Sequence, residues 1–592
     1  MAINATKRDE ETVEASKSKT LLRLFSYLLD YKKQIFQVLL IMLFCVVINI
    51  INPLFMEAAI DDYIIPKNLN GLITLVIIAI FINLVMIAMI KLRTIIMAKM
   101  CNHILVKIRK DLYSHIQTLD FHFFDSRPTG KILARIIGDI NSLKDVLSDS
   151  VTILIPDFIT ICAVVIIMFI KNPLLAAASL LSTPIMALGT TIIQIMSHKR
   201  WQLHRKKSSN LNAYVHEDMS GIRVIQSFAA EKETKEAFDK LAEESRDSFM
   251  SAVRVNDAFG SVIDLCWALG LFALYFVGIV ILGIDSVSIG TFMAFATYIN
   301  MFWNPIMNLS NFYTKLITNL SAAERVFEIM DREPEIKDAI DVTDIPEIKG
   351  AVEFKNVSFA YDEETKVLND VSFSIKPGET IALVGPTGAG KTTIVNLISR
   401  FYDVQKGTVS IDGYDVKKIS IHSLRSQLGI MTQDNFLFTG TIRDNIAYGK
   451  PDATDEEIIA AAKAVNAHDF IMKLKDGYQT ELAERGGGLS IGQKQLLAFA
   501  RTMISMPKIL ILDEATSSID TQTEILVQKG IEQLLKDRTS FVIAHRLSTI
   551  KKADRIFVID DGGIIEEGTS DQLLQKKGAY YRLYMSQFEE VL

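Results

Sequence analysis

GPTGAGKT, residues 385–392, is the stretch that decides the fold of the second half of this chain. It matches the phosphate-loop pattern G-x-x-x-x-G-K-[ST]. IALV, residues 381–384, precedes it and predicts a buried strand, and a helical pattern follows it. A strand, this loop and a helix in that order predict an α/β domain that binds the phosphates of a nucleotide.

The chemistry expected of the phosphate loop follows from its residue types. Its glycines let backbone amides approach phosphate oxygens, and the helix expected to start near Lys391 points the positive end of its dipole at the same place. Lys391 is predicted to reach the β- and γ-phosphates, and Thr392 to bind Mg²⁺. The glycines are Gly385, Gly388 and Gly390.

A second motif, ILILDE at residues 509–514, follows the phosphate loop at a distance of about 120 residues. Its four apolar residues predict a central strand that is buried on both faces. Asp513 at the carboxyl end can hold Mg²⁺, and Glu514 can orient and polarise an attacking water molecule. The alternative interpretation is that these acids begin a helix, and it is less favoured because the motif lies downstream of a phosphate loop.

The composition of the 592 residues predicts two unlike parts. Apolar types make up 49% of the chain although 22% of its residues are charged, which suggests a membrane part joined to a soluble part. The net charge of −6 does not favour nucleic acid as a partner. The four cysteines lack metal-ligand spacing and are interpreted as small apolar side chains packed in helices.

Six long apolar stretches lie in the first half, and each is long enough to cross about 30 Å of hydrocarbon as a helix. A set of buried helices in a soluble protein is the alternative, which six such stretches make weak. The sixth stretch is the most polar, with three asparagines. The predicted spans are 35–55, 72–90, 151–170, 173–196, 259–282 and 289–309.

The charges between the spans predict their orientation. The segments after spans two and four are long and rich in Lys and Arg, whereas the other three loops are short and carry few basic residues. Positive charge marks the cytoplasmic side, so both long segments and both termini are expected in the cytoplasm. Residues 1–20 are polar and resemble no cleaved signal peptide, and residues 21–33 predict an amphipathic interfacial helix.

The predicted fold is a six-helix, all-α membrane domain followed by an α/β phosphate-loop NTPase domain. A polar tail is expected at 1–20, the transmembrane domain at 21–330, a charged linker at 331–349 and the nucleotide-binding domain at 350–592. In the last part, short apolar runs alternate with helical stretches and glycine turns, which is typical of α/β domains.

LSIGQKQ, residues 489–495, resembles the LSGGQ signature of the ATP-binding cassette (ABC) family. With six spans ahead of one nucleotide domain, the chain from about residue 20 to 590 resembles an ABC exporter half-transporter. The resemblance implies ATP and Mg²⁺ as ligands, a head-to-tail dimer, and export by alternating access in the plasma membrane. A bilayer and a small amphipathic or drug-like substrate are the other expected partners.

The resemblance also implies roles for residues around the phosphate loop. Tyr361 would stack on adenine, although a packed tyrosine at a strand end is the alternative. Gln433 would sense Mg²⁺ and water and touch the membrane domain, and His545 would contact the γ-phosphate. The remaining loop residues expected to contact ATP are Pro386, Thr387, Ala389 and Thr393.

At the dimer interface, the resemblance implies that Ser490, Gly492 and Gln493 contact ATP held by the partner. Asp520 would lie in the loop that crosses this interface. Glu484 and Arg485 match a crossover loop of exporters. Residues 123–133 and 220–231 resemble the two cytoplasmic loops that each contain a short coupling helix resting on a nucleotide domain.

The signature departs from the family pattern at its third position, where Ile491 replaces glycine. Lys494 and Leu496 also replace the arginines that are common after it. Because Glu514 and His545 are intact, the chain resembles one member of a heterodimer that has one active and one impaired site. The alternative is a homodimer in which Ile491 is a neutral substitution at a position that tolerates change.

Candidates for substrate contact are the carboxylates inside predicted spans, because such charges are costly in a membrane. Asp157 lies in span three, and Asp264 lies in span five near Trp267. A carboxylate beside an aromatic ring could hold a lipophilic cation, and structural pairing within the bundle is the alternative. A lipid or glycolipid flippase, or an ATP-gated regulator that does not pump, are the rival functions.

Overall fold

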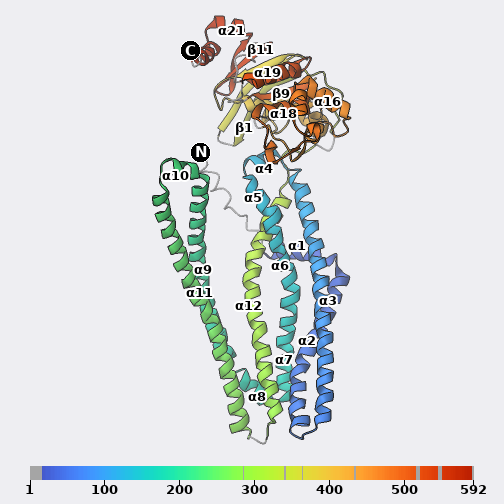
Figure 1. Cartoon of the computed structure of the whole chain (residues 1–592), viewed down its shortest axis with the longest axis vertical. Helices are drawn as coiled ribbons and strands as arrows, with labels where there is room; N and C mark the ends of the chain where they lie inside the picture. The colour runs from blue at the N-terminus through green and yellow to red at the C-terminus, as the bar shows by residue number, and fades with distance from the viewer. Residues whose placement is uncertain are drawn as a thin grey trace. The chain divides into compact units, whose positions relative to one another are not determined.

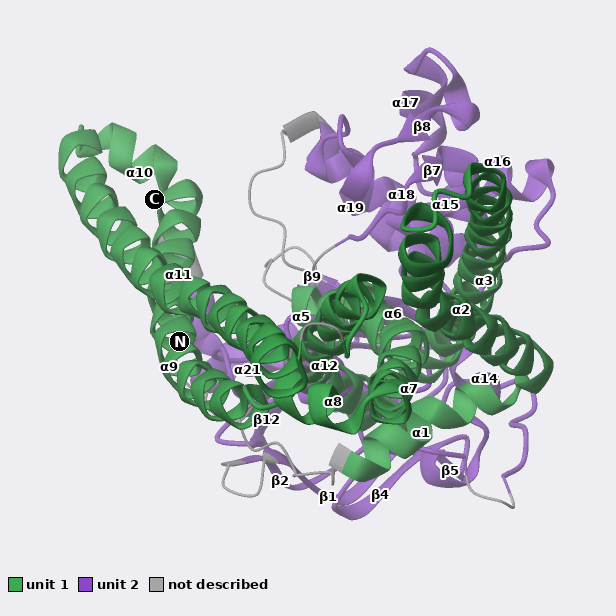
Figure 2. Ribbon diagram, turned by 90° about the horizontal axis from the view of Figure 1, so that it is seen from below, with its two compact units in different colours: residues 1–117, 129–332 green, residues 118–128, 333–592 purple. Residues whose placement is uncertain are grey.

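The computed structural model describes residues 17–283, 286–338, 342–362, 365–432, 435–514, 521–544 and 550–589. The chain divides into two compact units (Figure 2). The helical unit comprises residues 1–117 and 129–332, and the α/β unit comprises residues 118–128 and 333–592.

The helical unit is built mainly of long helices (Figure 1). Leu69–Ile116, Thr183–Ser220 and Glu231–Phe276 each join an apolar stretch to a charged stretch without a break. This continuity agrees with the helical periodicity of the segments after spans two and four. Its helices are α1 (Lys17–Leu29), α2 (Lys32–Ala58), α3 (Leu69–Ile116), α5 (Thr129–Ala134), α6 (Ile140–Asp149), α7 (Ile155–Lys171), α8 (Pro173–Ser179), α9 (Thr183–Ser220), α10 (Ile222–Ser227), α11 (Glu231–Phe276) and α12 (Ile289–Asp331). Short π-helical turns adjoin them at η2 (Ala59–Ile64), η3 (Arg135–Asp139), η4 (Ser150–Leu154) and η5 (Val277–Ile281).

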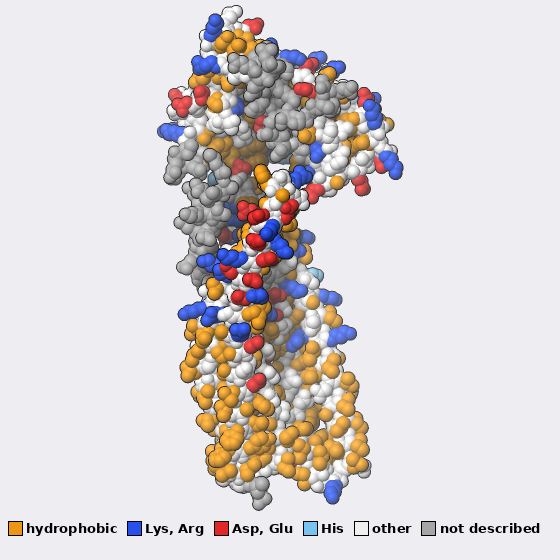
Figure 3. Space-filling view, turned by 60° about the vertical axis from the view of Figure 1, so that its left-hand side comes forward, with side chains coloured by type: hydrophobic (Ala, Val, Ile, Leu, Met, Phe, Trp, Pro, Cys, Tyr) orange, Lys and Arg blue, Asp and Glu red, His pale blue; other side chains and the backbone are white. Residues whose placement is uncertain are grey.

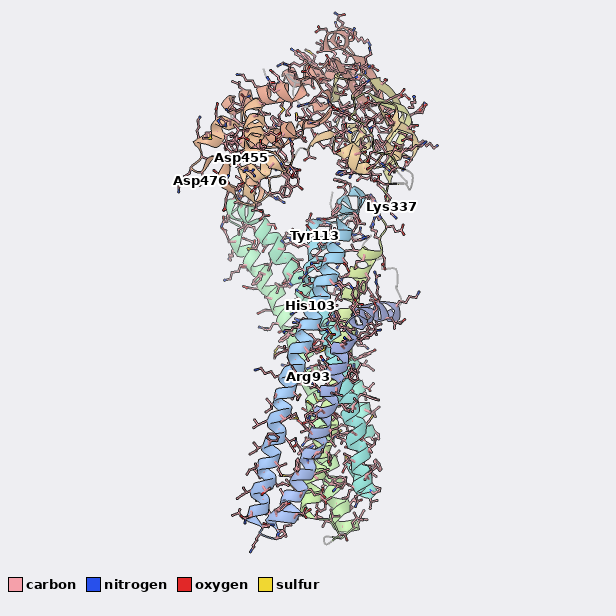
Figure 4. The ribbon with its side chains drawn as sticks, turned by 90° about the vertical axis from the view of Figure 1, so that its right-hand side faces the viewer. Arg93, His103, Tyr113, Lys337, Asp455 and Asp476 are labelled. Carbon is pink, nitrogen blue, oxygen red and sulfur yellow. The ribbon has the colours of Figure 1, made fainter. Side chains whose placement is uncertain are left out.

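Among the described residues, five stretches are long and apolar enough to cross a membrane: Lys32–Ile64, Leu69–Ile116, Thr129–Lys171, Pro173–Ser220 and Glu231–Ile281. The sixth predicted span lies in α12, whose asparagines make it the most polar of the six. Hydrophobic side chains cover the lower part of the helical unit in Figure 3, and charged side chains gather higher on the same helices. Figure 4 shows Arg93, His103 and Tyr113 spaced along the charged part of α3.

The cysteine interpretation holds for three of the four residues. Cys45, Cys101 and Cys266 are buried among apolar helices. Cys162 is exposed on α7, so the expectation that it is packed is wrong for the single chain. The helical period places it on a face of α7 that the other helices of its own chain do not cover.

Polar contacts join the end of α2 and the adjoining η2 to the end of α7 and the start of α12. Lys171 forms an ion pair with Glu57 at 2.9 Å, and the Thr291 hydroxyl donates to the same carboxylate at 2.9 Å. The backbone N–H of Gly290 donates to Asp61 in η2, also at 2.9 Å. A Cβ atom on Gly290 would lie 2.6 Å from the Glu57 carbonyl oxygen, so this approach requires glycine.

Replacing Gly290 with alanine is therefore expected to destabilise the helical unit by about 1–3 kcal/mol, because backbone must move to admit the methyl group. Thermal unfolding of the purified chain in detergent measures the effect as a lower midpoint. Gly260→Ala is the matched control, since no atom lies within 4 Å of its added Cβ and alanine favours the interior of α11. A Gly290→Ala midpoint at or above that of the parent would contradict this prediction.

The α/β unit contains two main sheets, as far as the structure describes it. The antiparallel sheet has the order β2 (Thr365–Ile375), β1 (Val352–Asp362), β4 (Lys406–Ile411), β5 (Tyr414–Asp415). The second sheet has the order β12 (Gly563–Gly568), β11 (Arg555–Asp560), β3 (Thr380–Val384), β10 (Thr539–Ala544), β9 (Ile509–Glu514), β6 (Leu428–Met431). All its pairs are parallel except that of β11 with β12.

Helices complete the unit. They are α4 (Phe121–Asp125), α13 (Lys391–Ile398), α14 (Ile421–Arg425), α15 (Ile442–Ala447), α16 (Asp455–Ala464), α17 (His468–Lys473), α18 (Ile491–Ile504), α19 (Thr521–Leu535), α21 (Ser570–Lys576) and α22 (Ala579–Glu589). Strand β9 is buried on both faces, because Leu510 and Leu512 belong to one core and Ile509 and Ile511 to the other. The prediction of a doubly buried central strand is confirmed.

Helix α4 shows that one predicted coupling segment packs on the α/β unit. Its Phe121 ring lies 4.2 Å from that of Phe401, and Asp125 accepts a hydrogen bond from Tyr402. A short helix in the first loop that rests on the nucleotide domain is thereby confirmed. The second loop also contains a short helix, α10, which belongs to the helical unit.

Candidate functional site

Four parallel strands end at one edge of the large sheet, and the sequence motifs follow those ends. The register pairs Ile543 with both Leu383 and Asp513, and it pairs Met431 with Leu512. The phosphate loop therefore starts at the same edge where Asp513 and Glu514 end β9. Ligands of α/β sheets bind at the carboxyl ends of the strands, so this edge is the candidate nucleotide site.

The phosphate loop requires two of its glycines for steric reasons. Gly385 has φ of 150°, and a Cβ atom there would lie 2.1 Å from the Ile559 carbonyl oxygen. Gly390 has φ of 104°, and its Cβ atom would lie 2.8 Å from Leu368. At Gly388 nothing lies within 4 Å, which leaves room for a group above the loop. This cradle fits the phosphate chain of a nucleotide.

Lys391 lies over the loop, at the start of α13. Its ammonium donates hydrogen bonds to the carbonyl oxygens of Gly385 and Pro386, both at 2.8 Å, and the residue is only 7% exposed. Burial lowers the pKa of Lys391, while the charge of Asp513 raises it. The register places the end of β9, which carries Asp513, at the same edge of the sheet as the start of the phosphate loop. Thr392 is exposed beside them and Thr393 is buried.

Tyr361 belongs to the same site, at the end of β1. Its hydroxyl lies 3.1 Å from the Thr393 hydroxyl, and its ring packs edge-to-face on Phe359 at 4.9 Å. The ring is 37% exposed. An aromatic surface is thus available next to the phosphate loop.

The signature residues begin helix α18. Ser490 is the N-cap, since its hydroxyl accepts from the Gln493 N–H at 3.3 Å and the Gln493 side chain accepts from the Ser490 N–H at 3.0 Å. Ile491, the departure from the pattern, is 53% exposed, whereas Gly492 is buried. Lys494 donates to the Arg485 carbonyl oxygen at 2.8 Å, and the Arg485 backbone is left-handed with φ of 55°.

Several predicted site residues lie outside the described residues. These are Gln433, which follows β6, His545, which follows β10, and Asp520. For Glu514 the backbone is described but the side chain is not. Their roles stay predictions, although the strands that precede Gln433 and His545 end at the candidate edge.

A cleft of about 420 Å³ borders the phosphate loop on another side. Its lining includes loop residues from Pro386 to Ala389 but not Tyr361, Lys391 or Thr392. We therefore place the nucleotide site at the strand edge and not in this cleft. The other lining residues are Lys366, Val367, Asn369, Asp560, Asp561 and Gly562.

Comparison with known protein families decides the identity of the chain. Residues 35–306 match the family model described as the ABC transporter transmembrane region, and residues 368–517 match the model described as ABC transporter. The lipid A-core flippase of Syntrophus aciditrophicus is 38% identical over 539 residues, which cover 90% of this chain and 89% of that protein. The chain belongs to the ABC transporter family.

Two further comparisons place the chain among ABC exporters. A Staphylococcus aureus protein, provisionally named a multidrug export ATP-binding/permease protein, is 36% identical over 573 residues, which cover 95% of this chain and 99% of that protein. A bacterial Atm1-family ABC exporter solved with ATP bound has a TM-score of 0.78 and 28% identity, covering 94% of this chain and 98% of the other. This ABC exporter is a multi-pass membrane protein with ATPase activity coupled to transport, and ABC exporters function as dimers.

The sequence did not point to Arg501. In this ABC exporter its side chain forms hydrogen bonds with two residues of the segment that follows Gln433. Its guanidinium donates to the carbonyl oxygens of Asn445 and Phe436 and to the Asn445 side chain, each at 2.9 Å. Burial lowers the pKa of Arg501. The arginine follows the signature by eight residues and looks like an ordinary helix residue, so only the fold reveals its contacts.

The residues of this ABC exporter that were predicted to contact substrate in the membrane differ in burial and hydrogen bonding. Asp157 accepts a hydrogen bond from Asn308 of α12, and within the described part its second carboxylate oxygen is buried without a partner. The indole N–H of Trp267 is likewise buried and unpaired among the described residues. Asp264 is exposed in the single chain.

Proposed function

We propose that this exporter moves amphipathic or drug-like substrates across the plasma membrane, with both termini in the cytoplasm, as one half of a heterodimer. The single observation that carries the ATPase site is the position of the Lys391 ammonium over the phosphate loop, at the strand edge where Asp513 and Glu514 end β9. Lys391 would hold the β- and γ-phosphates, and Glu514 would orient the attacking water.

Mg²⁺ would be held by Thr392, Asp513 and Gln433, and when bound it neutralises the charge of the phosphates. The exposed Thr392 hydroxyl and the oxygens of Asp513 and Gln433 are the donors that Mg²⁺ prefers. Tyr361 would stack on the base, and His545 would contact the γ-phosphate. The backbone amides of Gly385–Thr393 would bind the phosphate oxygens.

The exposed side chain of Ile491 supports the heterodimer. Ser490, Gly492 and Gln493 would contact ATP bound to a partner chain, and a branched side chain at the helix start takes up room where the family has glycine. The site completed by this signature would be weakened. A partner with an intact signature would complete the phosphate-loop site of this chain.

Mg-ATPase activity and oligomer mass of the purified chain test this proposal, with Glu514→Gln as the blank. A monomer, or a dimer with negligible turnover, is the expected result, and turnover should appear when the partner chain is added. A dimer of this chain alone with robust turnover that depends on Glu514 would instead mean a homodimer. No nucleotide-dependent turnover in any assembly would overturn the proposed ATPase site.

A polar stripe on α12 supports an amphipathic substrate. Thr297, Asn300, Asn304, Asn308 and Asn311 are spaced by three or four residues and are all exposed in the single chain. They extend over about 21 Å of the helix at 1.5 Å per residue. Such a stripe is unfavourable against lipid and suits a path for polar head groups. Asp157, bonded to Asn308, would add a negative charge to this path.

Replacing Asp157 with asparagine is expected to weaken binding of the lipophilic cation tetraphenylphosphonium about tenfold, because the attraction between two opposite charges near a protein surface is about 1–4 kcal/mol and a tenfold change corresponds to about 1.4 kcal/mol. Equilibrium dialysis of the full chain in lipid nanodiscs measures this affinity. Tetraphenylborate, with the same shape and opposite charge, should not bind more weakly. Asp62→Asn, an exposed carboxylate in η2, is the matched control.

Equal affinity of the parent and Asp157→Asn for tetraphenylphosphonium would remove Asp157 as a cation site. The same measurement on Asp264→Asn and Trp267→Phe ranks the other candidates. A lipid or glycolipid flippase is the second candidate function, favoured by the similarity to the Syntrophus flippase. Stimulation of ATP hydrolysis by lipids and not by cationic drugs would support it.

A further inference from the structure

Two tyrosines connect the candidate adenine surface to helix α4 inside the α/β unit. The ring of Tyr361 packs edge-to-face on the ring of Tyr402, with centroids 4.9 Å apart. Tyr402 follows α13 and also contacts Phe359 at 5.7 Å. Tyr402 is therefore a direct neighbour of the residue proposed to stack on the base.

The other end of Tyr402 touches α4. Its hydroxyl donates a hydrogen bond of 2.6 Å to the Asp125 carboxylate. Burial, together with this carboxylate, raises the pKa of Tyr402 above its ordinary value. The hydroxyl therefore stays protonated and donates at all physiological pH values. A hydrogen bond to a charged acceptor is stronger than one between neutral groups.

The Tyr361 side chain is also tied to the phosphate-binding helix. Besides the contact with Thr393, its hydroxyl accepts a hydrogen bond from the Asn396 side chain at 3.4 Å. A base placed on the Tyr361 ring would press on a side chain held at its hydroxyl by α13 and at its ring by Tyr402. A shift of the Tyr361 ring would thus reach Tyr402 through van der Waals contact.

Other anchors of α4 do not involve the tyrosines. Asp120, the residue before α4, accepts a hydrogen bond from the Glu335 N–H at 2.8 Å. Phe121 packs on Phe401 as described above. These contacts can hold α4 on the unit whether or not a base is present, whereas the Tyr402 bond ends directly beside Tyr361.

We infer that Tyr402 is a positioning residue that makes the docking of α4 depend on the base of the nucleotide, and not only on its phosphates. The inference rests on the proposed contact between Tyr361 and adenine. Stacking on Tyr361 restrains the ring against which Tyr402 packs, which orders the Tyr402 hydroxyl toward Asp125. Helix α4 then exchanges fewer conformations when the base is bound.

Amide hydrogen exchange of residues 118–128 in the full chain in nanodiscs tests this inference. The probes are no nucleotide, magnesium tripolyphosphate, and the non-hydrolysable ATP analogue adenylyl imidodiphosphate with Mg²⁺. We expect the analogue to slow exchange about fivefold more than tripolyphosphate does. Tyr402→Phe should erase this difference, and Asp125→Asn, which retains an acceptor oxygen, should preserve most of it.

Tyr478→Phe is the matched control, because it removes a tyrosine hydroxyl that lies 2.9 Å from His468 elsewhere in the same unit. It should retain the full effect of the analogue. Tyr402→Phe with the same base-dependent protection as the parent would overturn the inference, and so would tripolyphosphate protecting α4 as well as the analogue.

The affinity of each variant for the analogue distinguishes failure of the proposed adenine contact from failure of the relay through Tyr402. If Tyr361→Ala binds the analogue as tightly as the parent does, the proposed adenine contact fails and the inference fails with it. If Tyr361→Ala weakens binding while Tyr402→Phe leaves the exchange pattern unchanged, only the relay through Tyr402 fails.

Discussion

Replacing Lys391 with methionine should lower ATP turnover at least about a hundredfold, because positive charge that meets the phosphates is among the largest contributions to phosphoryl transfer. Methionine keeps an unbranched apolar stem of similar length. The side chain is buried and its ammonium is bonded only 2.8 Å from two loop carbonyl oxygens, so it is already positioned over the cradle. Phosphate release measured in the assembly that hydrolyses ATP gives the result.

Lys366→Met is the matched control for this experiment. Lys366 is an exposed lysine of β2 that lines the cleft on the other side of the loop. If general positive charge near the loop were sufficient, both variants would lose activity. We expect turnover to fall only for Lys391→Met, and turnover near the parent value in that variant would refute the assignment of the phosphate site.

The second large effect is expected on stability, at Arg501. Replacing it with methionine removes the donor from the carbonyl oxygen and side chain of the buried Asn445 and from the more exposed carbonyl oxygen of Phe436, and each buried group left unsatisfied costs about 1–3 kcal/mol. We expect a total loss of about 3 kcal/mol in the free energy of unfolding of the α/β unit. Denaturant unfolding of the full chain in detergent, followed by the far-ultraviolet signal and by ATP binding, measures this loss.

Arg443→Met makes the same substitution on the surface of α15. Its partner Asp455, 2.7 Å away, has a side chain that is 68% exposed, and exposed ion pairs contribute little. The midpoint of this control should stay close to that of the parent. Equal unfolding midpoints for Arg501→Met and Arg443→Met would show that the three bonds of Arg501 do not stabilise the unit.

Much of the candidate site was predictable because its residues follow strands. Parallel strands bring their carboxyl ends to one edge, so motifs after IALV and within ILILDE had to meet once both strands joined the same sheet. The register of β3, β10 and β9 agrees with this prediction. Turn and loop motifs of this kind depend on local backbone, which neighbouring residues in sequence determine.

Contacts between distant segments were not predictable in this way. Tyr402 and Asp125 are 277 residues apart, and although Asp125 lies in the predicted coupling segment, nothing in the sequence pointed to Tyr402 as its partner. The need for glycine at Gly290 likewise depends on Glu57 of α2, more than 200 positions away. No local pattern distinguishes these residues from others of the same type.

The sequence by itself determined the elements: apolar length sets the membrane helices, and alternating runs and glycines set the strands. The phosphate-loop motif predicts where a nucleotide binds. Only the tertiary structure decided which side chains meet, such as Tyr402 with Asp125, Arg501 with Asn445, and Asp157 with Asn308. The physical reason is the distance along the sequence over which each of these effects acts. Backbone preference and hydrophobic period act within a few residues, whereas a side-chain contact depends on how whole elements pack.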